Sequence, residues 1–212
     1  MGRPIMRVSC AAAAAIGWFS LVLQYVVGNA YQSPALTLNF FSYFTILSNI
    51  LAATMLTVAA LRPEEPRPWL TRPRAATAIA LYMTVTGLVY VFILQSLWNP
   101  QGWAFVADSG LHHVMPVLVV LCWLAFVPKG TLAPRAVPAW LIFPLLYGVY
   151  SLARGPFADW YPYPFIDAGK LGYSQTALNI VLLLVGFIVL AGIYVALDRA
   201  LAGIRPAKAT AR

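Results

Sequence analysis

Charged residues are scarce in this 212-residue chain: only 9% of its residues are Asp, Glu, Lys or Arg, and only 6 are acidic. Ordinary soluble domains carry about 25% charged residues, so the composition argues against a soluble globular domain. Apolar residues make up 61% of the chain, and its mean hydropathy is +0.78. Because a membrane-crossing helix needs about 20 largely apolar residues, the length allows six such helices and leaves no room for a second soluble domain.

Cysteine and histidine are also rare, with two of each. Cys10 and Cys122 lie near or within apolar runs, which argues against a disulfide or a metal pair. His112 and His113 are adjacent, so they lack the helical spacing that places two metal ligands on one face. The sequence therefore predicts neither a metal site nor a cofactor.

The net charge of +8 is distributed between the apolar runs. If the chain crosses the membrane six times, one side receives Arg3, Arg7, Arg62, Arg67, Arg72, Arg74, Lys129, Arg135, Arg199, Arg205, Lys208 and Arg212. The opposite loops hold only Lys170, with Arg154 at a helix end. Basic loops stay in the cytoplasm, so both termini are predicted to be cytoplasmic. A nucleic-acid partner is not expected, because Glu64, Glu65 and four prolines interrupt the longest basic stretch.

The apolar runs predict an all-α fold, a six-transmembrane-helix bundle that forms a single membrane domain over residues 1–212. The expected helices are at about 8–27, 38–61, 75–98, 111–127, 138–152 and 176–197. The first run also fits a cleavable signal peptide, but its length favours a retained helix. Pro144 predicts a kink in the fifth helix. The loop 155–175 is rich in proline and aromatic residues, a composition that forms a stiff cap over the outer helix ends.

Polar residues inside the apolar runs are candidate functional residues, because an unpaired polar group in hydrocarbon costs free energy. Ser42, Thr45 and Asn49 recur at spacings of three and four, which predicts one face of the second helix, directed into the bundle. The alternative is that these hydroxyls bond to the preceding turn and only assist helix packing.

The two histidines are predicted at the outer start of the fourth helix, after Asp108, which is expected in a loop as a helix cap or as a group that orients a histidine. Neighbours on a helix point about 100° apart, so only one histidine can face a given pocket. Histidine transfers protons near neutral pH, whereas an interfacial histidine can simply contact headgroups. Thr45 and the histidines are both expected in the outer half of the membrane.

Three motifs in this order resemble the androgen-induced-gene family of six-pass membrane proteins, which has a large bacterial branch. They are YFTILSN in the second helix, HHVMP opening the fourth, and WYPYPFID before the sixth. For the animal members the resemblance implies a membrane hydrolase that cleaves fatty-acid esters of hydroxy fatty acids with a threonine nucleophile and a histidine base. The threonine matches Thr45 and the histidine matches His112, with His113 as the alternative. Tyr163 and Phe165 match the aromatic-proline motif, which is expected to form a wall or lid.

The combined interpretation is a lipid ester hydrolase of the bacterial inner membrane, with a membrane lipid or fatty-acyl ester as substrate. Ser42, Asn49 and Asn179 are candidate donors to the oxyanion that forms when Thr45 attacks the ester. The alternatives are a non-enzymatic protein that binds lipid or transports a small solute, and a structural subunit of a larger complex. Transport usually requires a charged residue in the middle of a span, and none is present here. The sequence identifies no oligomeric partner.

Overall fold

The structure is a computed structural model that describes residues 2–62 and 66–202. All regular elements in these ranges are helical, and six helices are long and apolar enough to cross a membrane. The chain is therefore an all-α, multi-pass membrane protein, as its hydropathy predicts. Arg205, Lys208 and Arg212, whose charges enter the topology argument, and Glu64 and Glu65, which enter the argument against a nucleic-acid partner, lie outside the described residues.

The helical elements follow one another with short connections. In order they are α1 (Gly2–Val27), η1 (Ala30–Gln32), α2 (Pro34–Phe40), α3 (Phe44–Leu61), η2 (Trp69–Thr71), α4 (Pro73–Val89), η3 (Tyr90–Leu94), η4 (Gln95–Leu97), α5 (Trp103–Ser109), η5 (Gly110–Val114), α6 (Met115–Phe126), η6 (Pro134–Ala136), α7 (Val137–Ala158), η7 (Pro164–Ile166) and α8 (Ala168–Ala202). Three spans are composite: α4 continues through η3 and η4, α5 continues through η5 into α6, and η6 continues into α7. Both η3 and η5 are π-helical turns.

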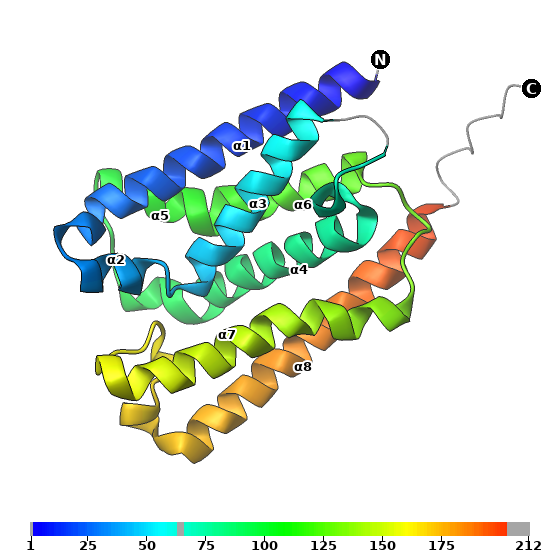
Figure 1. The fold of residues 1–212 in the computed structure, drawn as a ribbon. Helices are drawn as coiled ribbons and strands as arrows, with labels where there is room; N and C mark the ends of the chain where they lie inside the picture. The colour runs from blue at the N-terminus through cyan, green and yellow to red at the C-terminus, as the bar shows by residue number, and fades with distance from the viewer. Residues whose placement is uncertain (1, 63–65, 203–212) are drawn as a thin grey trace, which may run out of the picture.

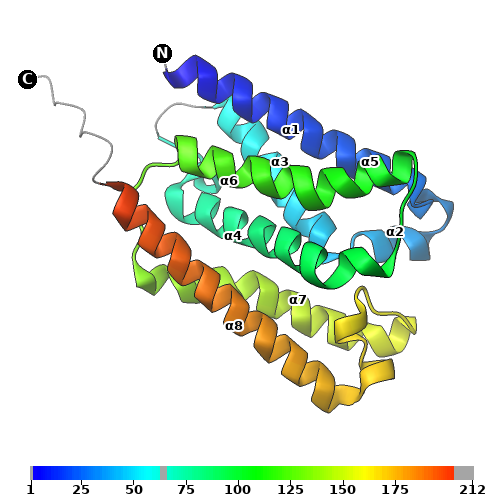
Figure 2. The ribbon, with the colours of Figure 1, turned by 180° about the vertical axis from the view of Figure 1, so that it is seen from behind.

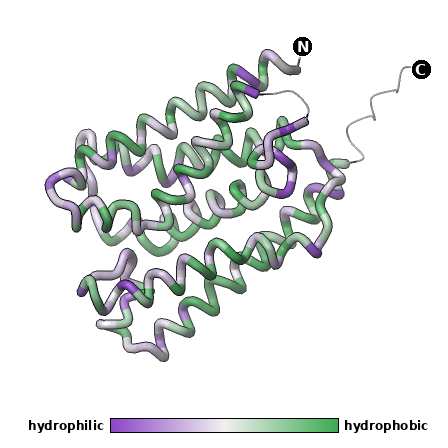
Figure 3. The backbone as a smooth tube through the Cα atoms, in the orientation of Figure 1, coloured by the Kyte–Doolittle hydropathy of each residue, from purple (hydrophilic) through white to green (hydrophobic). Residues whose placement is uncertain are grey.

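The helices form two groups (Figure 1). α1, α3, α4, α5 and α6 pack together, and α7 and α8 form a hairpin beside them, as the view from behind also shows (Figure 2). Aromatic side chains connect the groups: the Phe44 ring of α3 lies 5.2 Å from the rings of Phe143 and Tyr147 on α7 and 6.0 Å from that of Phe187 on α8. α1 begins and α8 ends at the same end of the bundle. Hydrophilic residues concentrate near the helix ends and in the loops (Figure 3).

The expected second helix, 38–61, is two helices. α2 ends at Phe40, Tyr43 is extended (φ −81°, ψ 132°), and α3 begins at Phe44. Ser42 Oγ lies 2.7 Å from the carbonyl oxygen of Leu38, so a side chain takes the place of a helical amide there. The expectation that Ser42, Thr45 and Asn49 share one helix face is wrong, because Ser42 precedes α3.

The fourth span also differs from expectation. It begins at Trp103 instead of 111, so Asp108 and both histidines lie within a continuous helical segment. Asp108 is therefore neither a loop residue nor a solvated cap: it is 8% exposed and its carboxylate faces His112, one helical turn later. A carboxylate can be buried in this way because it has hydrogen-bonding partners inside the bundle.

The last two helices are longer than predicted. α7 extends through Pro144 to Ala158 instead of ending near 152, and α8 begins at Ala168 instead of 176. Gly172 interrupts the first turns of α8 with a φ of 74°, a conformation that glycine adopts without steric cost. The Pro- and aromatic-rich loop is consequently short, and η7 lies within it.

Candidate active site

Thr45 lies in the first turn of α3, directly after the break at residues 41–43. Its hydroxyl is 3.2 Å from the phenol oxygen of Tyr163, and its amide donates to the same oxygen at 3.1 Å. Amides of a first helical turn have no partner within the helix, and they form the positive end of the helix dipole. The break in the second span therefore places the threonine hydroxyl beside a group of hydrogen-bond donors.

His112 brings an imidazole to this hydroxyl. Its Nε2 is 3.3 Å from Thr45 Oγ1. Its Nδ1 is 3.0 Å from the backbone carbonyl oxygen of Asp108 and 3.1 Å from the Asp108 carboxylate oxygen Oδ1. Both neighbours of Nδ1 are acceptors, so the proton resides on Nδ1 and the lone pair of Nε2 faces the threonine. Thr45, His112 and Asp108 thus lie in the order hydroxyl, imidazole and carboxylate, which is the order that a hydrolytic triad requires.

Tyr90 contacts both Asp108 and His112. Its hydroxyl donates to Asp108 Oδ2, and its ring stacks on the His112 imidazole with centroids 4.1 Å apart and planes 15° apart. His113 meets the edge of the same ring at 5.1 Å. Between the two histidines, only His112 makes a hydrogen bond to Thr45 within the described ranges.

Both members of this stack lie on π-helical turns, Tyr90 on η3 and His112 on η5. A π turn contains one extra residue and changes the direction of the side chains around it, and such turns are frequent at functional sites. Glycines permit the close helix contacts beside them. A Cβ at Gly110 would overlap Ser20 of α1, and one at Gly87 would lie 3.1 Å from Pro116.

Asn49 connects the two helices that carry the threonine and the histidine. Its amide nitrogen donates to the carbonyl oxygens of Thr45 (2.8 Å) and Leu111 (3.2 Å), and the residue is fully buried. Both of its N–H donors are therefore occupied, so Asn49 fixes the distance between α3 and η5 and is not free to bind an oxyanion.

The other two predicted oxyanion donors are also directed elsewhere. Ser42 Oγ contacts the hydroxyl of Tyr150 at 2.7 Å as well as the Leu38 carbonyl. Asn179 donates to the carbonyl oxygen of Phe165 at 2.8 Å. Tyr163 is the pocket or oxyanion candidate whose hydroxyl does reach the Thr45 hydroxyl, and its oxygen also accepts from the Thr45 amide. Burial raises the pKa of Tyr163 to about 12, so this phenol stays neutral and retains its proton.

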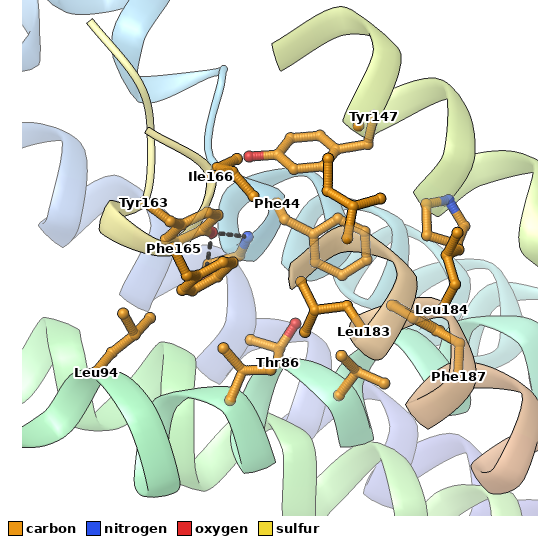
Figure 4. A pocket seen from close by; sticks show the side chains of 16 residues that line it. Phe44, Thr86, Leu94, Tyr147, Tyr163, Phe165, Ile166, Leu183, Leu184 and Phe187 are labelled. Carbon is orange, nitrogen blue, oxygen red and sulfur yellow. Dashed lines mark hydrogen bonds between the residues drawn. The ribbon is translucent and has the colours of Figure 1, made fainter. Parts of the chain in front are cut away.

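Two cavities of different character meet at Thr45. One, of about 460 Å³, is lined by apolar side chains and by polar groups that include Gln24, Asn99, Asp108 and His112, and it is called the polar cavity below because the other has fewer polar groups. The other, of about 80 Å³, lies between α3, α4, α7 and α8 and is lined mainly by apolar side chains (Figure 4). Tyr163 and Phe165 line the apolar pocket, with their rings stacked 5.2 Å apart. The aromatic-proline segment is thus placed as a wall.

Tyr163 is among the pocket or oxyanion candidates that the sequence predicts, whereas Tyr90, which contacts both Asp108 and His112, is not. A tyrosine inside an apolar run is the available signal for Tyr90, because its buried hydroxyl requires a partner. No family model, curated protein or solved structure matches this chain. The resemblance to the androgen-induced-gene family therefore stays a prediction.

Proposed function

We propose that this protein is an intramembrane hydrolase of fatty-acyl esters that uses Thr45 as its nucleophile. The observation that carries the proposal is the contact chain from Thr45 Oγ1 to His112 Nε2 (3.3 Å) and from His112 Nδ1 to the Asp108 carboxylate (3.1 Å). A hydroxyl is a weak nucleophile until a neighbouring base removes its proton. The predicted family resemblance implies esters of hydroxy fatty acids as substrates, among related acyl esters.

The reaction proceeds in two halves. Thr45 Oγ1 attacks the ester carbonyl carbon while His112 Nε2 accepts the hydroxyl proton, and the Asp108 carboxylate stabilises the resulting imidazolium. The Tyr163 hydroxyl, whose oxygen accepts from the Thr45 amide, donates to the carbonyl oxygen as it becomes negative. Collapse of this intermediate breaks the bond to the alcohol oxygen, which takes the proton from His112. Water, deprotonated by His112, then hydrolyses the acyl-threonine, releases the fatty acid and restores the Thr45 hydroxyl.

The test is covalent labelling of the purified protein in detergent by a fluorophosphonate probe. Wild type should be labelled, and both Thr45→Ala and His112→Ala should abolish the label, since each removes one partner of the 3.3 Å contact. His113→Ala is the matched control and should keep the label. A folded wild type that is neither labelled nor able to hydrolyse an acyl ester would instead support the lipid-binding or transport alternative.

For topology, we propose that the end of the bundle where α1 begins and α8 ends faces the cytoplasm of a bacterial cell, across its inner membrane. The connection between α3 and α4, which carries Arg62, Arg67 and Arg72, lies at that end, and so does the connection between α6 and α7, which carries Lys129 and Arg135. Basic loops favour the cytoplasmic side, and this orientation places Thr45 in the outer half of the membrane. A C-terminal green fluorescent protein fusion should fluoresce, whereas a dark, fully expressed fusion would reverse the orientation.

A further inference from the structure

The apolar pocket beside Thr45 has a lining that consists mainly of hydrocarbon. Four of its lining residues carry a polar side-chain group, namely Thr45, Thr86, Tyr147 and Tyr163, and the others are apolar. Phe44, Leu183 and Phe187 are among the side chains around it (Figure 4). All four polar groups have partners within the protein: Thr86 bonds to Ser48, Tyr147 to the Ser42 carbonyl, and Tyr163 and Thr45 to each other. The pocket therefore presents hydrocarbon to its contents, with the threonine hydroxyl at its edge.

This pocket adjoins a groove on the outside of the bundle. The groove has a volume of about 390 Å³, runs between α4 with η3 and α8, and shares Val85, Val89, Phe165, Leu183 and Phe187 with the pocket. Its outer members face away from the protein: Leu182 is 60% exposed and Ile93 is 44% exposed. In a membrane-spanning helix such side chains contact lipid acyl chains.

The polar cavity lies on the other side of the same hydroxyl. Asp108 and His112 line it, so water and an alcohol in this cavity lie next to the imidazole. An acyl ester has the same division around its carbonyl carbon, with a long hydrocarbon chain on one side and an oxygen-bearing alcohol on the other. The position of Thr45 between the two cavities matches this division.

We propose that the acyl chain of the substrate enters sideways from the bilayer through the groove between α4 and α8 and lies in the apolar pocket. The alcohol part and the attacking water occupy the polar cavity. The inference deepens the proposed hydrolase function and rests on it. The substrate class is a membrane-dissolved ester of a long-chain fatty acid, delivered from the lipid phase and not from water.

Three glycines allow a test by filling space. Gly148 lines the pocket and Gly186 lines the groove, and a Cβ at either position would meet no atom within 4 Å. Gly192 is also on α8 with open space at its Cβ, but it lines none of these cavities. Gly148→Leu and Gly186→Leu therefore fill the proposed path, and Gly192→Leu is the matched control.

The measurement is the ratio of kcat/KM for palmitoyl and butyryl p-nitrophenyl esters in mixed micelles. Because a change of one methylene in an apolar pocket alters discrimination by roughly tenfold or more, Gly148→Leu and Gly186→Leu should each lower the ratio by at least that factor. Gly192→Leu should leave the ratio unchanged. Unchanged ratios in Gly148→Leu and Gly186→Leu, with wild-type thermal unfolding and wild-type labelling of Thr45, would overturn the proposed path.

A second readout does not require hydrolysis. A palmitate ester with a diazirine at the chain terminus, incorporated in phosphatidylcholine vesicles with the Thr45→Ala protein, should crosslink to α4 and α8 residues of the groove and pocket. Crosslinks on α1 or α5 instead would overturn the inference. If the wild type hydrolyses no ester but the chain crosslinks to the groove, the proposed hydrolase function fails while the lipid site stands.

Discussion

Replacing Asp108 by asparagine removes one charge from the candidate site and leaves its shape intact. Asparagine can keep an oxygen toward His112 Nδ1, and its amide can donate to the Tyr90 hydroxyl in place of the bond that Tyr90 now makes. The backbone carbonyl oxygen of Asp108, 3.0 Å from Nδ1, is unaffected. The imidazole proton therefore stays on Nδ1, and the variant loses only the carboxylate charge that stabilises the imidazolium.

The size of the effect follows from Coulomb's law. Two unit charges about 4 Å apart attract by about 4 kcal/mol at an effective dielectric constant of 20, which corresponds to about three decades in rate. In serine proteases the equivalent change costs about 10⁴-fold because the histidine adopts the wrong tautomer. With the tautomer retained here, we expect kcat/KM for an acyl ester to fall by about 10²-fold to 10³-fold.

The assay is p-nitrophenyl ester hydrolysis, with thermal unfolding measured on the same preparations. Asp159→Asn is the control: Asp159 is exposed in the loop after α7, and its φ of 45° is one that asparagine tolerates. It should retain the wild-type rate. A folded Asp108→Asn protein that loses less than about tenfold, or a control that loses as much, would refute the triad reasoning.

Three further predictions concern Tyr163, Asp198 and the lining of the polar cavity. Tyr163→Phe removes a donor beside Thr45 and should lower kcat by about 10²-fold. Burial raises the pKa of Tyr163 from 10.0 to about 12, so the contribution of its hydroxyl to the free energy of unfolding is complete below pH 10 and is lost as the pH rises toward 12. The unfolding curves of wild type and variant should therefore converge between pH 10 and pH 12. Asp198→Ala leaves the Leu132 amide without the acceptor now 2.9 Å away and should reduce the free energy of unfolding by about 1–3 kcal/mol without changing the rate per folded molecule. Among the residues that line the polar cavity, all of which lie in the described part of the chain, none is Lys or Arg, so a carboxylate there would have no cationic partner. The methyl ester of a fatty-acid ester of a hydroxy fatty acid should therefore be hydrolysed faster than the form with a free carboxylate. The reverse preference would point to an unrecognised cationic site.

The six spans were predictable because bilayer thickness sets the length of an apolar run, whatever the helices contact. Their ends were less so. The break before α3 depends on Ser42 bonding to the Leu38 carbonyl, and the early start of the fourth span depends on Asp108 finding partners within the bundle. The periodicity of apolar residues carries no information on such contacts. The predicted second helix was therefore too long, and the predicted fourth helix was too short.

In the candidate site, the two side chains Thr45 and His112 could be identified from the sequence, whereas most of the contacts that position them could not. Thr45 and His112 stand out as a polar hydroxyl and an imidazole in apolar surroundings, and the structure brings them together. Tyr163 reaches Thr45 from 118 residues away along the chain, and Tyr90 reaches Asp108 through a π turn. Both contacts depend on the packing of separate helices, which the spacing of residues within one helix does not specify.

The two π turns make the site sensitive to the number of residues in a helix as well as to their identity. Deleting a single residue from η5 would restore ordinary α-helical geometry, and everything beyond the deletion would rotate by about 100° relative to what precedes it. The imidazole of His112 and the packing face of α6 could then no longer both keep their present directions. In evolution, the insertion of one codon into a regular membrane helix is enough to turn a side chain toward a neighbouring helix. The loss of one codon is enough to turn it away again.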